Sequence, residues 1–335
     1  STGGNIVTTN DNIQFDGAID LTGNVTLDSG AGIGNITLNS GVTETPVTTL
    51  TLAAAAGNIL LNPVTVSTLT FTTGTDLSLT GAVIVDNPFD TTNLLGTITI
   101  AAVSSVTTTA DNIIITRPVV LDANLSLDTG AGADISFANT GTIDDGAGGP
   151  WNLTVDAPGS VISFGAASGA GNGRIGGAAG ANRIGTLTVT DAGTVNFNGE
   201  VFTTVLTQTA GSVITTSNQA VNISGNISIS GTAVTINNGV TTTAGGTVTI
   251  TNTGALTIAA TGDMSLDGLF LQTGGGAVST GGNIVTSGDT IDFTNALTLT
   301  ESVLLDTGAG ADISFANTAT IDDGAGGPWN LTVDA

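Results

Sequence analysis

Two long stretches of this chain have almost the same sequence. Residues 127–157 read LDTGAGADISFANTGTIDDGAGGPWNLTVDA, and the same letters return at residues 305–335 with a single change, from Gly141 to Ala319. The eight residues STGGNIVT at 1–8 also return, unchanged, at 279–286. Internal repetition of this kind constrains the fold strongly, because each repeated unit must bury its apolar face against a neighbouring unit.

The spacing of the repeats favours a solenoid. Related segments begin at Asp11, Asp111 and Asp289, so the second interval between their starts is much longer than the first. A globular core would not tolerate so large an insertion, whereas a solenoid gains or loses whole coils because each coil contacts only its neighbours. Both intervals are near multiples of roughly 20 residues, which is the length expected for three short strands and their turns.

Short strands with alternating polarity occur along nearly the whole chain. Pairs of aliphatic residues such as Leu153 and Val155, or Ile227 and Ile229, bracket one small polar residue, so one side of each strand is apolar and the other is mostly Thr or Ser. Six strands begin with Gly, Asn and an aliphatic residue, at Asn5, Asn24, Asn35, Asn58, Asn226 and Asn283. We expect Gly or Asn there to supply a corner of positive φ, and the asparagines of stacked coils to share amide hydrogen bonds.

A β-sandwich is the main alternative fold. Its loops differ around the domain because its strands must reverse direction, and a sandwich usually contains about 100 residues. Here the alternation continues with near-identical units for the full length. The sequence therefore predicts an all-β protein, a right-handed parallel β-helix built from tandem repeats. We divide it into a short unit at 1–100, a long unit at 101–278 and a partial unit at 279–335, all within one continuous solenoid.

Two further features concern how far the coils continue along the chain and where the chain leaves them. Ala157 continues directly into the strand sequence PGSVISF, whereas its counterpart is Ala335, so we expect the array to run past residue 335. Residues 165–185 are rich in Gly and Ala, lack alternation and contain Arg174 and Arg183. We interpret this stretch as a loop that leaves the solenoid wall, either mobile with incidental charge or docked through its two Arg-Ile-Gly sequences on an acidic neighbour.

Composition excludes most kinds of chemistry. The chain has no Cys or His, and all 3 of its basic residues are Arg, so it has no thiol nucleophile, no Ser-His triad and no lysine Schiff base. Its 27 acidic residues give a net charge of -24, which opposes binding to nucleic acid or to an anionic membrane surface. No apolar run approaches the ~18 residues of a transmembrane helix, so we expect no membrane insertion. We assign no catalytic and no cofactor-binding residue.

Aspartates are the candidate ligands and acids. The pairs Asp144-Asp145 and Asp322-Asp323 are the nearest approach to the two carboxylates of a glycosidase, but neighbouring residues of a strand point to opposite faces, which favours a turn role. A calcium site is a further hypothesis. Its candidate ligands are two pairs of aspartates in the repeated DTGAGAD loops, namely Asp128 and Asp134 with their counterparts Asp306 and Asp312.

Threonine and tryptophan mark candidate binding surfaces. Thr247, Thr249 and Thr251 alternate with apolar residues and are expected to point outward. They could form part of a hydroxyl grid that faces ice or a crystalline glycan, provided that such residues align over many coils. Trp151 and Trp329 follow Gly-Gly-Pro in the two copies of the repeat. Either each indole ring stacks on a sugar, or it covers the end of a glycine-rich corner, and we favour the corner.

The repeated units resemble the β-strand-repeat stalks of filamentous-haemagglutinin-like and autotransporter bacterial surface adhesins. The residues that carry the resemblance are the GNI and NLTV or NITL strand units, LDTGAGADISF, and TVNFNG at 194–199. The resemblance implies a secreted right-handed β-helix that forms an extracellular stalk, and it transfers no catalytic residue.

We therefore expect a structural, non-enzymatic segment of an extracellular fibre, sheath or adhesin stalk at the cell surface. Open ends expose unpaired strand edges, so we expect end-to-end self-association, with lateral association and surface glycans as further partners. The alternative function is a carbohydrate-binding or polysaccharide-depolymerising β-helix. An enzyme would show one unrepeated cluster of carboxylates in a groove, whereas a fibre would show repeated and dispersed ones.

Overall fold

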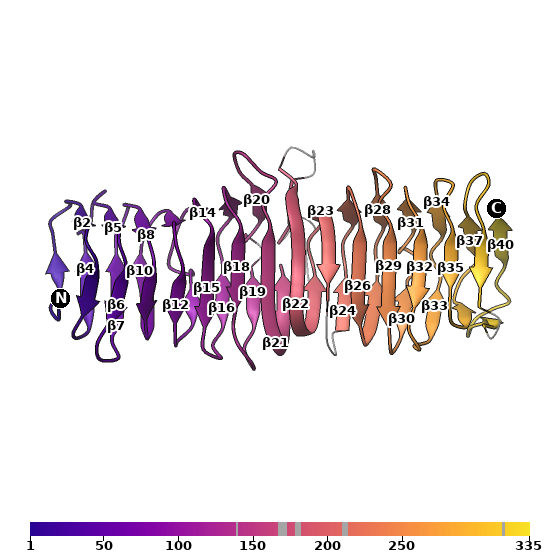
Figure 1. Cartoon of the computed structure of the whole chain (residues 1–335), viewed down its shortest axis with the longest axis horizontal. Helices are drawn as coiled ribbons and strands as arrows, with labels where there is room; N and C mark the ends of the chain where they lie inside the picture. The colour runs from indigo at the N-terminus through magenta and orange to yellow at the C-terminus, as the bar shows by residue number, and fades with distance from the viewer. Residues whose placement is uncertain (139, 167–172, 178–181, 210–213, 317–318) are drawn as a thin grey trace.

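The strands of this chain wind into one continuous coil, a parallel β-solenoid of about 14 turns. The structure is a computed structural model that describes residues 1–138, 140–166, 173–177, 182–209, 214–316 and 319–335. The two termini lie at opposite ends of the long axis (Figure 1). Within the described residues every strand pairing is parallel and no helix occurs, which confirms the predicted all-β parallel solenoid. The hand of the coil stays a prediction.

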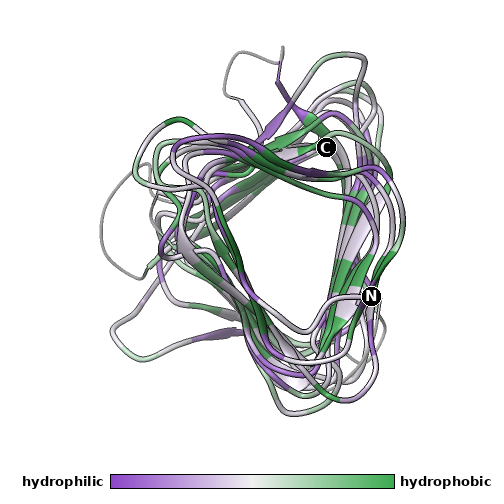
Figure 2. Cartoon of the chain, turned by 90° about the vertical axis from the view of Figure 1, so that its left-hand side faces the viewer, coloured by the Kyte–Doolittle hydropathy of each residue, from purple (hydrophilic) through white to green (hydrophobic). Residues whose placement is uncertain are grey.

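The wall has three faces, each a ladder of strands from successive coils, and an end-on view shows the three sides (Figure 2). We call them the first, second and third face after the strands β1, β2 and β3. The pattern is simple because each strand pairs with the one that lies a full turn later, as β1 pairs with β4, β2 with β5 and β3 with β6.

The strands belonging wholly to one face are these. The first face contains β1 (Ile6–Val7), β4 (Val25–Asp28), β7 (Thr49–Ala53), β10 (Thr68–Thr73), β13 (Phe89–Asp90), β16 (Ile113–Ile115), β19 (Ile135–Phe137), β24 (Ile214–Ser217), β27 (Ala233–Ile236), β30 (Leu256–Ile258), β33 (Val278–Thr280), β36 (Leu297–Leu299) and β39 (Ile321–Asp323). The second face contains β2 (Ile13–Phe15), β5 (Ile36–Leu38), β8 (Ile59–Leu61), β11 (Leu77–Leu79), β14 (Ile98–Ile100), β17 (Val119–Leu121), β20 (Ile143–Asp145), β25 (Val221–Ile223), β28 (Val240–Thr242), β31 (Met264–Leu266), β34 (Ile284–Thr286), β37 (Val303–Asp306) and β40 (Leu331–Asp334). The third face contains β3 (Ile19–Leu21), β6 (Val42–Glu44), β9 (Val64–Val66), β12 (Val83–Val85), β15 (Ser104–Thr108), β18 (Leu125–Asp128), β26 (Ile227–Gly231), β29 (Val248–Asn252), β32 (Phe270–Thr273), β35 (Ile291–Phe293) and β38 (Ile313–Phe315).

Three longer strands bend around a corner and belong to two faces. These are β21 (Leu153–Phe164), β22 (Ile184–Phe197) and β23 (Val201–Gln208). β21 and β22 pair with each other on both the third and the first face. β23 pairs with β25 on the second face and with β26 on the third. The wall is therefore continuous through the middle of the chain.

Alternation places the aliphatic residues in the lumen, as the sequence predicts. Leu153 and Val155 are fully buried, and so are Val248 and Ile250, while the Thr between each pair lies on the outside. Phenylalanines stack in the lumen from one coil to the next, with ring centroids 5.1 Å apart for Phe137 and Phe164. Burial of each such side chain contributes about 1.5–3 kcal/mol, so stability is distributed along the whole length.

The coils vary in length, and loops absorb the difference. Ile59 pairs with Leu77 one turn later, so this coil is close to the predicted length of roughly 20 residues. The coil in which Leu153 pairs with Leu187 is much longer, because the Gly- and Ala-rich stretch falls inside it. Neither predicted unit boundary interrupts the wall, since β14 pairs with both β11 and β17, and β33 with both β30 and β36.

The loop predicted over residues 165–185 needs a correction. Ile175 forms parallel bridges to Ile143 of β20 and to Val201 of β23, so it fills the second face of its coil. Ile184 is the first residue of β22. Both isoleucines are fully buried. The apolar residue of each Arg-Ile-Gly sequence therefore belongs to the wall, which periodicity could not reveal because glycines surround it.

The related segments begin on different faces. The segment that starts with β2 lies first on the second face, the one that starts with β16 on the first face, and the one that starts with β35 on the third face. The copies at 127–157 and 305–335 are likewise displaced, since β18 is on the third face and β37 on the second. Any face accepts any copy because all three require the same alternation of apolar and small polar residues.

Candidate functional site

A ladder of asparagine and aspartate side chains follows the corner before the second face. The side-chain carbonyl of Asn12 accepts the backbone N–H of Asn35 at 2.8 Å, and that of Asn35 accepts the N–H of Asn58 at 2.8 Å. The ladder continues through Asn58 to Asp76 and from Asp76 to Thr97. Each side chain thus joins two coils by accepting a backbone N–H, whereas the sequence predicted hydrogen bonds between two amide side chains.

Glycine precedes asparagine at these corners for a steric reason. A Cβ atom added to Gly57 would lie 2.0 Å from the carbonyl oxygen of Gly34, so a side chain there would force the coils apart. None of the six glycines in the Gly-Asn pairs has a positive φ. The prediction of a positive-φ corner at these positions was therefore wrong, and close stacking of the backbone takes its place at Gly34, Gly57, Gly225 and Gly282.

Beside this ladder lies an open trough of about 450 Å³ on the second face. Its lining includes the outward side chains Thr37, Ser78 and Thr99 together with Asn58 and Asp76. The carboxylate of Asp76 already accepts the N–H of Thr97 at 2.8 Å. The trough thus offers hydroxyl and amide groups for hydrogen bonding and no pair of free carboxylates.

A second trough, of about 460 Å³, lies on the first face. Its lining includes Ser136, Ser163 and Asn196, which occupy the same outward position in three successive coils. Asn198 and Asn218 line its edge, and the amide of Asn218 donates a 2.7 Å hydrogen bond to the side-chain oxygen of Asn198. Asn237 donates to Asn218 at 2.8 Å in the next coil, so an amide ladder occurs here, at asparagines outside the Gly-Asn pairs for which it was predicted.

The outward row of the first face continues well beyond this trough. Thr216, Thr235, Thr257, Ser279 and Thr298 follow Asn196 at the same position in successive coils, before Asp322 ends the row. We call the residues from Ser136 to Thr298 at this position the first-face row. The alignment over many coils that a hydroxyl grid requires is present here, with Asn196 as the one amide in the row. On the third face the row through Thr249 holds hydroxyl side chains in successive coils without a break from Ser105 to Thr249, and Leu271 then follows.

The paired aspartates serve two separate structural contacts. Asp144 forms a salt bridge with Arg174, with 2.9 Å between the oxygen and the guanidinium nitrogen. Asp145 accepts the backbone N–H of Trp151 at 2.8 Å, and Asp323 accepts that of Trp329 at 3.0 Å. Burial raises the pKa of Asp145, although the hydrogen bond from Trp151 opposes this shift. Asp144 and Asp145 therefore do not address one bond, and the turn role applies to Asp145 and Asp323, whereas Asp144 forms its ion pair from within β20.

Both tryptophans pack on the wall. Trp151 and Trp329 are partly buried against the hydrophobic core, and a Cβ atom on Gly148 would lie 3.8 Å from the Trp151 ring. The indole N–H of Trp151 donates to the carbonyl of Ala147. The ring therefore covers the glycine-rich corner, as the sequence favoured.

The calcium candidates are engaged by the backbone. Asp128 accepts the N–H of Gly130 at 2.8 Å, Asp306 accepts that of Gly308 at 2.7 Å, and Asp134 accepts that of Val161 at 2.8 Å. Among the described contacts, none links the side chain of Asp312 to Asp128, Asp134 or Asp306. Calcium prefers 6–8 oxygen ligands, and the described part of the chain holds no group of three or more acidic residues that could bind a metal ion. The calcium hypothesis stays a prediction.

An acidic row on the third face was not visible in the sequence. Asp128 and Asp156 are register partners in adjacent coils, and Asp191 follows in the next. Burial raises the pKa of Asp156, and repulsion from Asp128 and Asp191 adds to the shift. One carboxylate oxygen of Asp156 is buried without a hydrogen-bond partner. The row was hidden because its members are separated by loops of different length.

The two arginines of the Gly- and Ala-rich stretch are anchored to the wall. Arg174 docks on Asp144, which agrees with the interpretation that an Arg-Ile-Gly sequence binds an acidic neighbour. Arg183 donates to the backbone carbonyls of Thr203 and Asn222, and its guanidinium lies 5.9 Å from the ring centre of Phe202. The residues between them, 178–181, lie outside the described part of the chain.

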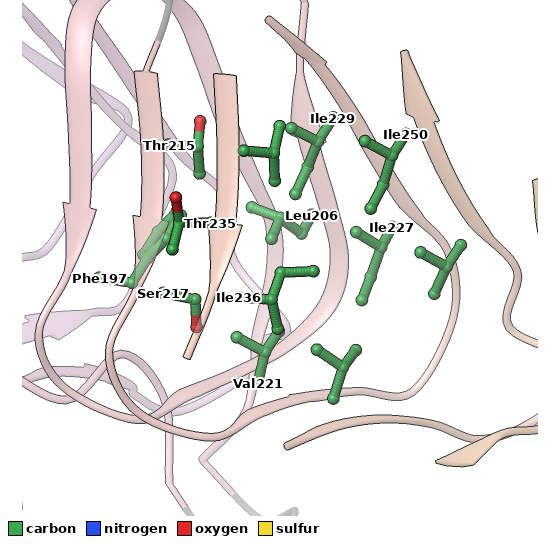
Figure 3. Close-up of a pocket in the computed structure, with 13 residues that line it drawn as sticks. Phe197, Leu206, Thr215, Ser217, Val221, Ile227, Ile229, Thr235, Ile236 and Ile250 are labelled. Atoms are coloured by element: carbon green, nitrogen blue, oxygen red, sulfur yellow. The ribbon is translucent and has the colours of Figure 1, made fainter. Parts of the chain in front are cut away.

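A small cavity of about 20 Å³ lies in the lumen (Figure 3). The phenylalanine stack on the first face ends at Phe197, because the next two residues of the column are Ser217 and Ile236. Serine fills less space than phenylalanine, and the remaining volume is that of about one water molecule. Most of the lining is aliphatic, including Leu206 and Val221. The cavity is a packing defect, too small for an organic ligand.

No protein-family model matches the chain, and no curated protein or solved structure was found to be similar to it. The described residues contain no helix long and apolar enough to cross a membrane. The fold is therefore established as a β-solenoid from its own strand pairing, and no family is assigned.

Proposed function

We propose that this chain is a structural segment of an extracellular fibre, sheath or adhesin stalk, in which its role is mechanical. The observation that carries the proposal is the unbroken lumen. Apolar side chains make up most of it from Val25 to Leu305, with a few buried polar side chains among them, and each described coil stacks directly on the previous one through three parallel ladders. A wall of this kind resists bending because distortion at any coil would break hydrogen bonds on all three faces.

The dimensions suit a spacer. With parallel strands ~4.8 Å apart, about 14 turns give a rod of about 65–70 Å. Its length is set by the number of coils, and the variable loops change the surface without changing the axis. Such a segment can be extended by duplication, and the near identity of 127–157 and 305–335 is consistent with growth in this way.

The surface charge suits an exposed position outside the cell. Only 3 basic residues occur in 335, so trypsin-like proteases have few cleavage sites. All three arginines are held: Arg117 donates to the carbonyl of Thr92, while Arg174 and Arg183 bind as described above. A net charge of -24 also keeps separate rods apart at low salt.

The test combines shape with a designed change of length. Val234 pairs with Leu256, so deleting residues 234–255 removes one turn and joins Ala233 to Leu256 in the same face. X-ray scattering and negative-stain microscopy should show a straight rod for the wild type and a folded rod shortened by ~4.8 Å for the deletion. A compact particle, or loss of folding on removal of this single turn, would contradict the mechanical role. Antibody labelling of intact producing cells tests the extracellular location.

Glycan binding is the second candidate function. The observation that favours it is the trough on the first face, where Ser136, Ser163 and Asn196 present hydroxyl and amide groups at neighbouring positions. Such groups hydrogen-bond sugars without the help of charge. A screen against insoluble and soluble polysaccharides should show binding that falls when Ser163 and Asn196 are both changed to Ala. Wild-type retention equal to that of the double variant would exclude this trough as the site.

A further inference from the structure

The chain contains three sequences in which asparagine precedes glycine, at 172–173, 198–199 and 238–239. An asparagine in this position is chemically labile, because the backbone nitrogen of the glycine can attack the side-chain amide and glycine has no side chain to hinder the approach. Residue 172 lies outside the described part of the chain, so the structure compares the other two. Both lie at the corner between the first and the second face, two coils apart.

The side-chain amide of Asn198 is held at both ends. Its nitrogen donates to the carbonyl of Gly165 at 2.9 Å, and its oxygen accepts the amide of Asn218 at 2.7 Å. Asn198 is only 7% exposed. Attack by the next backbone nitrogen would have to turn this amide out of both hydrogen bonds. The amide ladder of Asn198, Asn218 and Asn237 therefore protects its first member.

Asn238 lies one residue beyond the amide ladder. Asn237 takes the ladder position in this coil and donates to Asn218 at 2.8 Å. In register Asn237 corresponds to Asn198, so the two Asn-Gly sequences are offset by one position. Asn238 is partly exposed, and none of the described residues accepts a hydrogen bond from its side-chain nitrogen. Its amide is therefore free to turn.

The attacking nitrogen already lies beside the amide of Asn238. The backbone N–H of Gly239 donates to the side-chain oxygen of Asn238, with 2.8 Å between nitrogen and oxygen. Because a C=O bond is about 1.23 Å long, the side-chain carbon Cγ lies at most about 4 Å from that nitrogen. Reacting atoms in a near-attack arrangement are about 3–3.5 Å apart, so rotation of the free amide brings the two atoms into range.

We propose that Asn238 is a site of spontaneous deamidation and that the amide ladder protects Asn198 from the same reaction. Hydroxide removes the proton of the Gly239 nitrogen, which forms a bond to Cγ of Asn238 while the bond from Cγ to Nδ2 breaks. Ammonia leaves with a proton from water, which regenerates hydroxide. Water then opens the cyclic imide at either carbonyl. The product is aspartate or isoaspartate at position 238, with one more negative charge.

The wall accommodates the product at this position. Isoaspartate adds one methylene group to the main chain between Asn237, which is bonded to the previous coil, and Gly239, whose carbonyl accepts the N–H of Val221 at 3.0 Å. The backbone N–H and C=O of Asn238 itself have no partner among the described residues. No hydrogen bond between coils therefore has to break. Modified molecules should stay folded and accumulate with time, faster at higher pH because hydroxide starts the reaction.

Incubation at mildly alkaline pH, followed by peptic digestion and mass spectrometry, measures the loss of each amide. In the folded chain Asn238 should convert about tenfold faster than Asn198 or more, because the amide of Asn198 must first break its hydrogen bonds. In concentrated urea the two should convert at similar rates, since each precedes glycine and the amide ladder is gone. Equal rates in the folded chain, or faster conversion of Asn198, would overturn the proposal.

Gly239→Ala is the matched variant. A Cβ atom there would lie 3.6 Å from its nearest listed neighbour, the carbonyl oxygen of Asp263, and the residue has no positive φ, so the variant should fold. Crowding of the attacking nitrogen should slow the reaction at Asn238 by about tenfold or more, with thermal unfolding unchanged. An undiminished rate in the folded variant would contradict attack by this nitrogen. If the variant fails to fold, the comparison of folded and urea-unfolded wild type decides.

A second variant tests the protection of Asn198. Asn218→Ala removes the donor to the Asn198 oxygen and leaves the bond to Gly165 in place. Conversion of Asn198 should then speed up several-fold, while the rate at Asn238 rises by less. An unchanged rate at Asn198 in the folded variant would overturn the protective role of the amide ladder.

Discussion

The hydroxyl of Thr215 donates a 2.8 Å hydrogen bond to the side-chain oxygen of Gln208 inside the lumen. Thr215 is 2% exposed, and so is Gln208. The amide nitrogen of Gln208 donates in turn to the backbone carbonyl of Ser230 at 3.0 Å. The pair links the third face to the first across the lumen, and Thr215 lines the small cavity.

Thr215→Val should lower the free energy of unfolding by about 1–3 kcal/mol, because it leaves the Gln208 oxygen buried without a donor. Adding Gln208→Leu should recover much of the loss, since the unpaired side-chain oxygen is then removed and the carbonyl of Ser230 loses only its side-chain donor. Urea denaturation of both single variants and the double variant measures the coupling. Losses that simply add would show that the two side chains act independently.

Ile250→Asp should destabilise the chain far more than Thr249→Asp. Ile250 is fully buried in β29, and a carboxylate there would lose its hydration without a partner. We expect a loss above the usual range of about 0.5–3 kcal/mol for Ile250→Asp and a change within about 0.5 kcal/mol for Thr249→Asp. Thermal unfolding measures both. Similar losses would mean that the assignment of lumen and surface in this strand is wrong.

Asn58→Ala should lower stability by about 0.5–1.5 kcal/mol, because it removes the acceptor that joins two coils. Asn58→Asp should retain most of it, since only the carbonyl oxygen accepts the N–H of Asp76, and Asp76 itself fills the same role one coil later. Hydrogen exchange at the amide of Asp76 reports the bond directly. Faster exchange in the Asp variant than in the Ala variant would argue against this role.

Asp156→Asn should stabilise the chain at neutral pH, and the gain should disappear in acid. The pKa of Asp156 is raised in the folded chain by burial and then by Asp128 and Asp191. The folded chain thus keeps a proton at pH values where the unfolded chain has released it. The stability from this group is complete below the unfolded-state pKa of about 3.9 and is lost as pH rises through the folded-state value. Unfolding curves across pH should converge for the two chains in acid, and Asp20→Asn is the control outside the row.

Alternation was enough to predict the fold, and it failed where lumenal residues are polar or isolated. The alternation of Leu153, Thr154 and Val155 is enough to indicate which side of this strand faces the lumen. Thr215 and Ser217 point inward from β24 with no apolar signal of their own, and Ile175 enters the wall from a glycine-rich stretch. In each case the neighbouring coils impose the position, and that information is distant in the sequence.

Prediction of the surface was limited by the coil lengths. The first-face row and the row of Asp128, Asp156 and Asp191 appear only when successive coils are in register. The number of residues between register partners is small in the coil of β8 and large in the coil of β21. No fixed sequence period therefore aligns these residues. The corner aspartates were easier to interpret, because Asp145 and Asp323 contact residues only six positions away.

The copies of the repeat begin on different faces, and this determines the direction in which an identical loop points. The loop with Trp151 follows β20 on the second face, whereas the loop with Trp329 follows β39 on the first. The direction in which a loop points around the axis therefore depends on the number of strands that precede it, and not on the loop's own sequence. Insertion of a single strand upstream would turn everything beyond it by about one third of a revolution without altering any local contact. Gene duplication alone can thus place one surface element on several sides of the same solenoid, so that copies of an identical loop point in different directions.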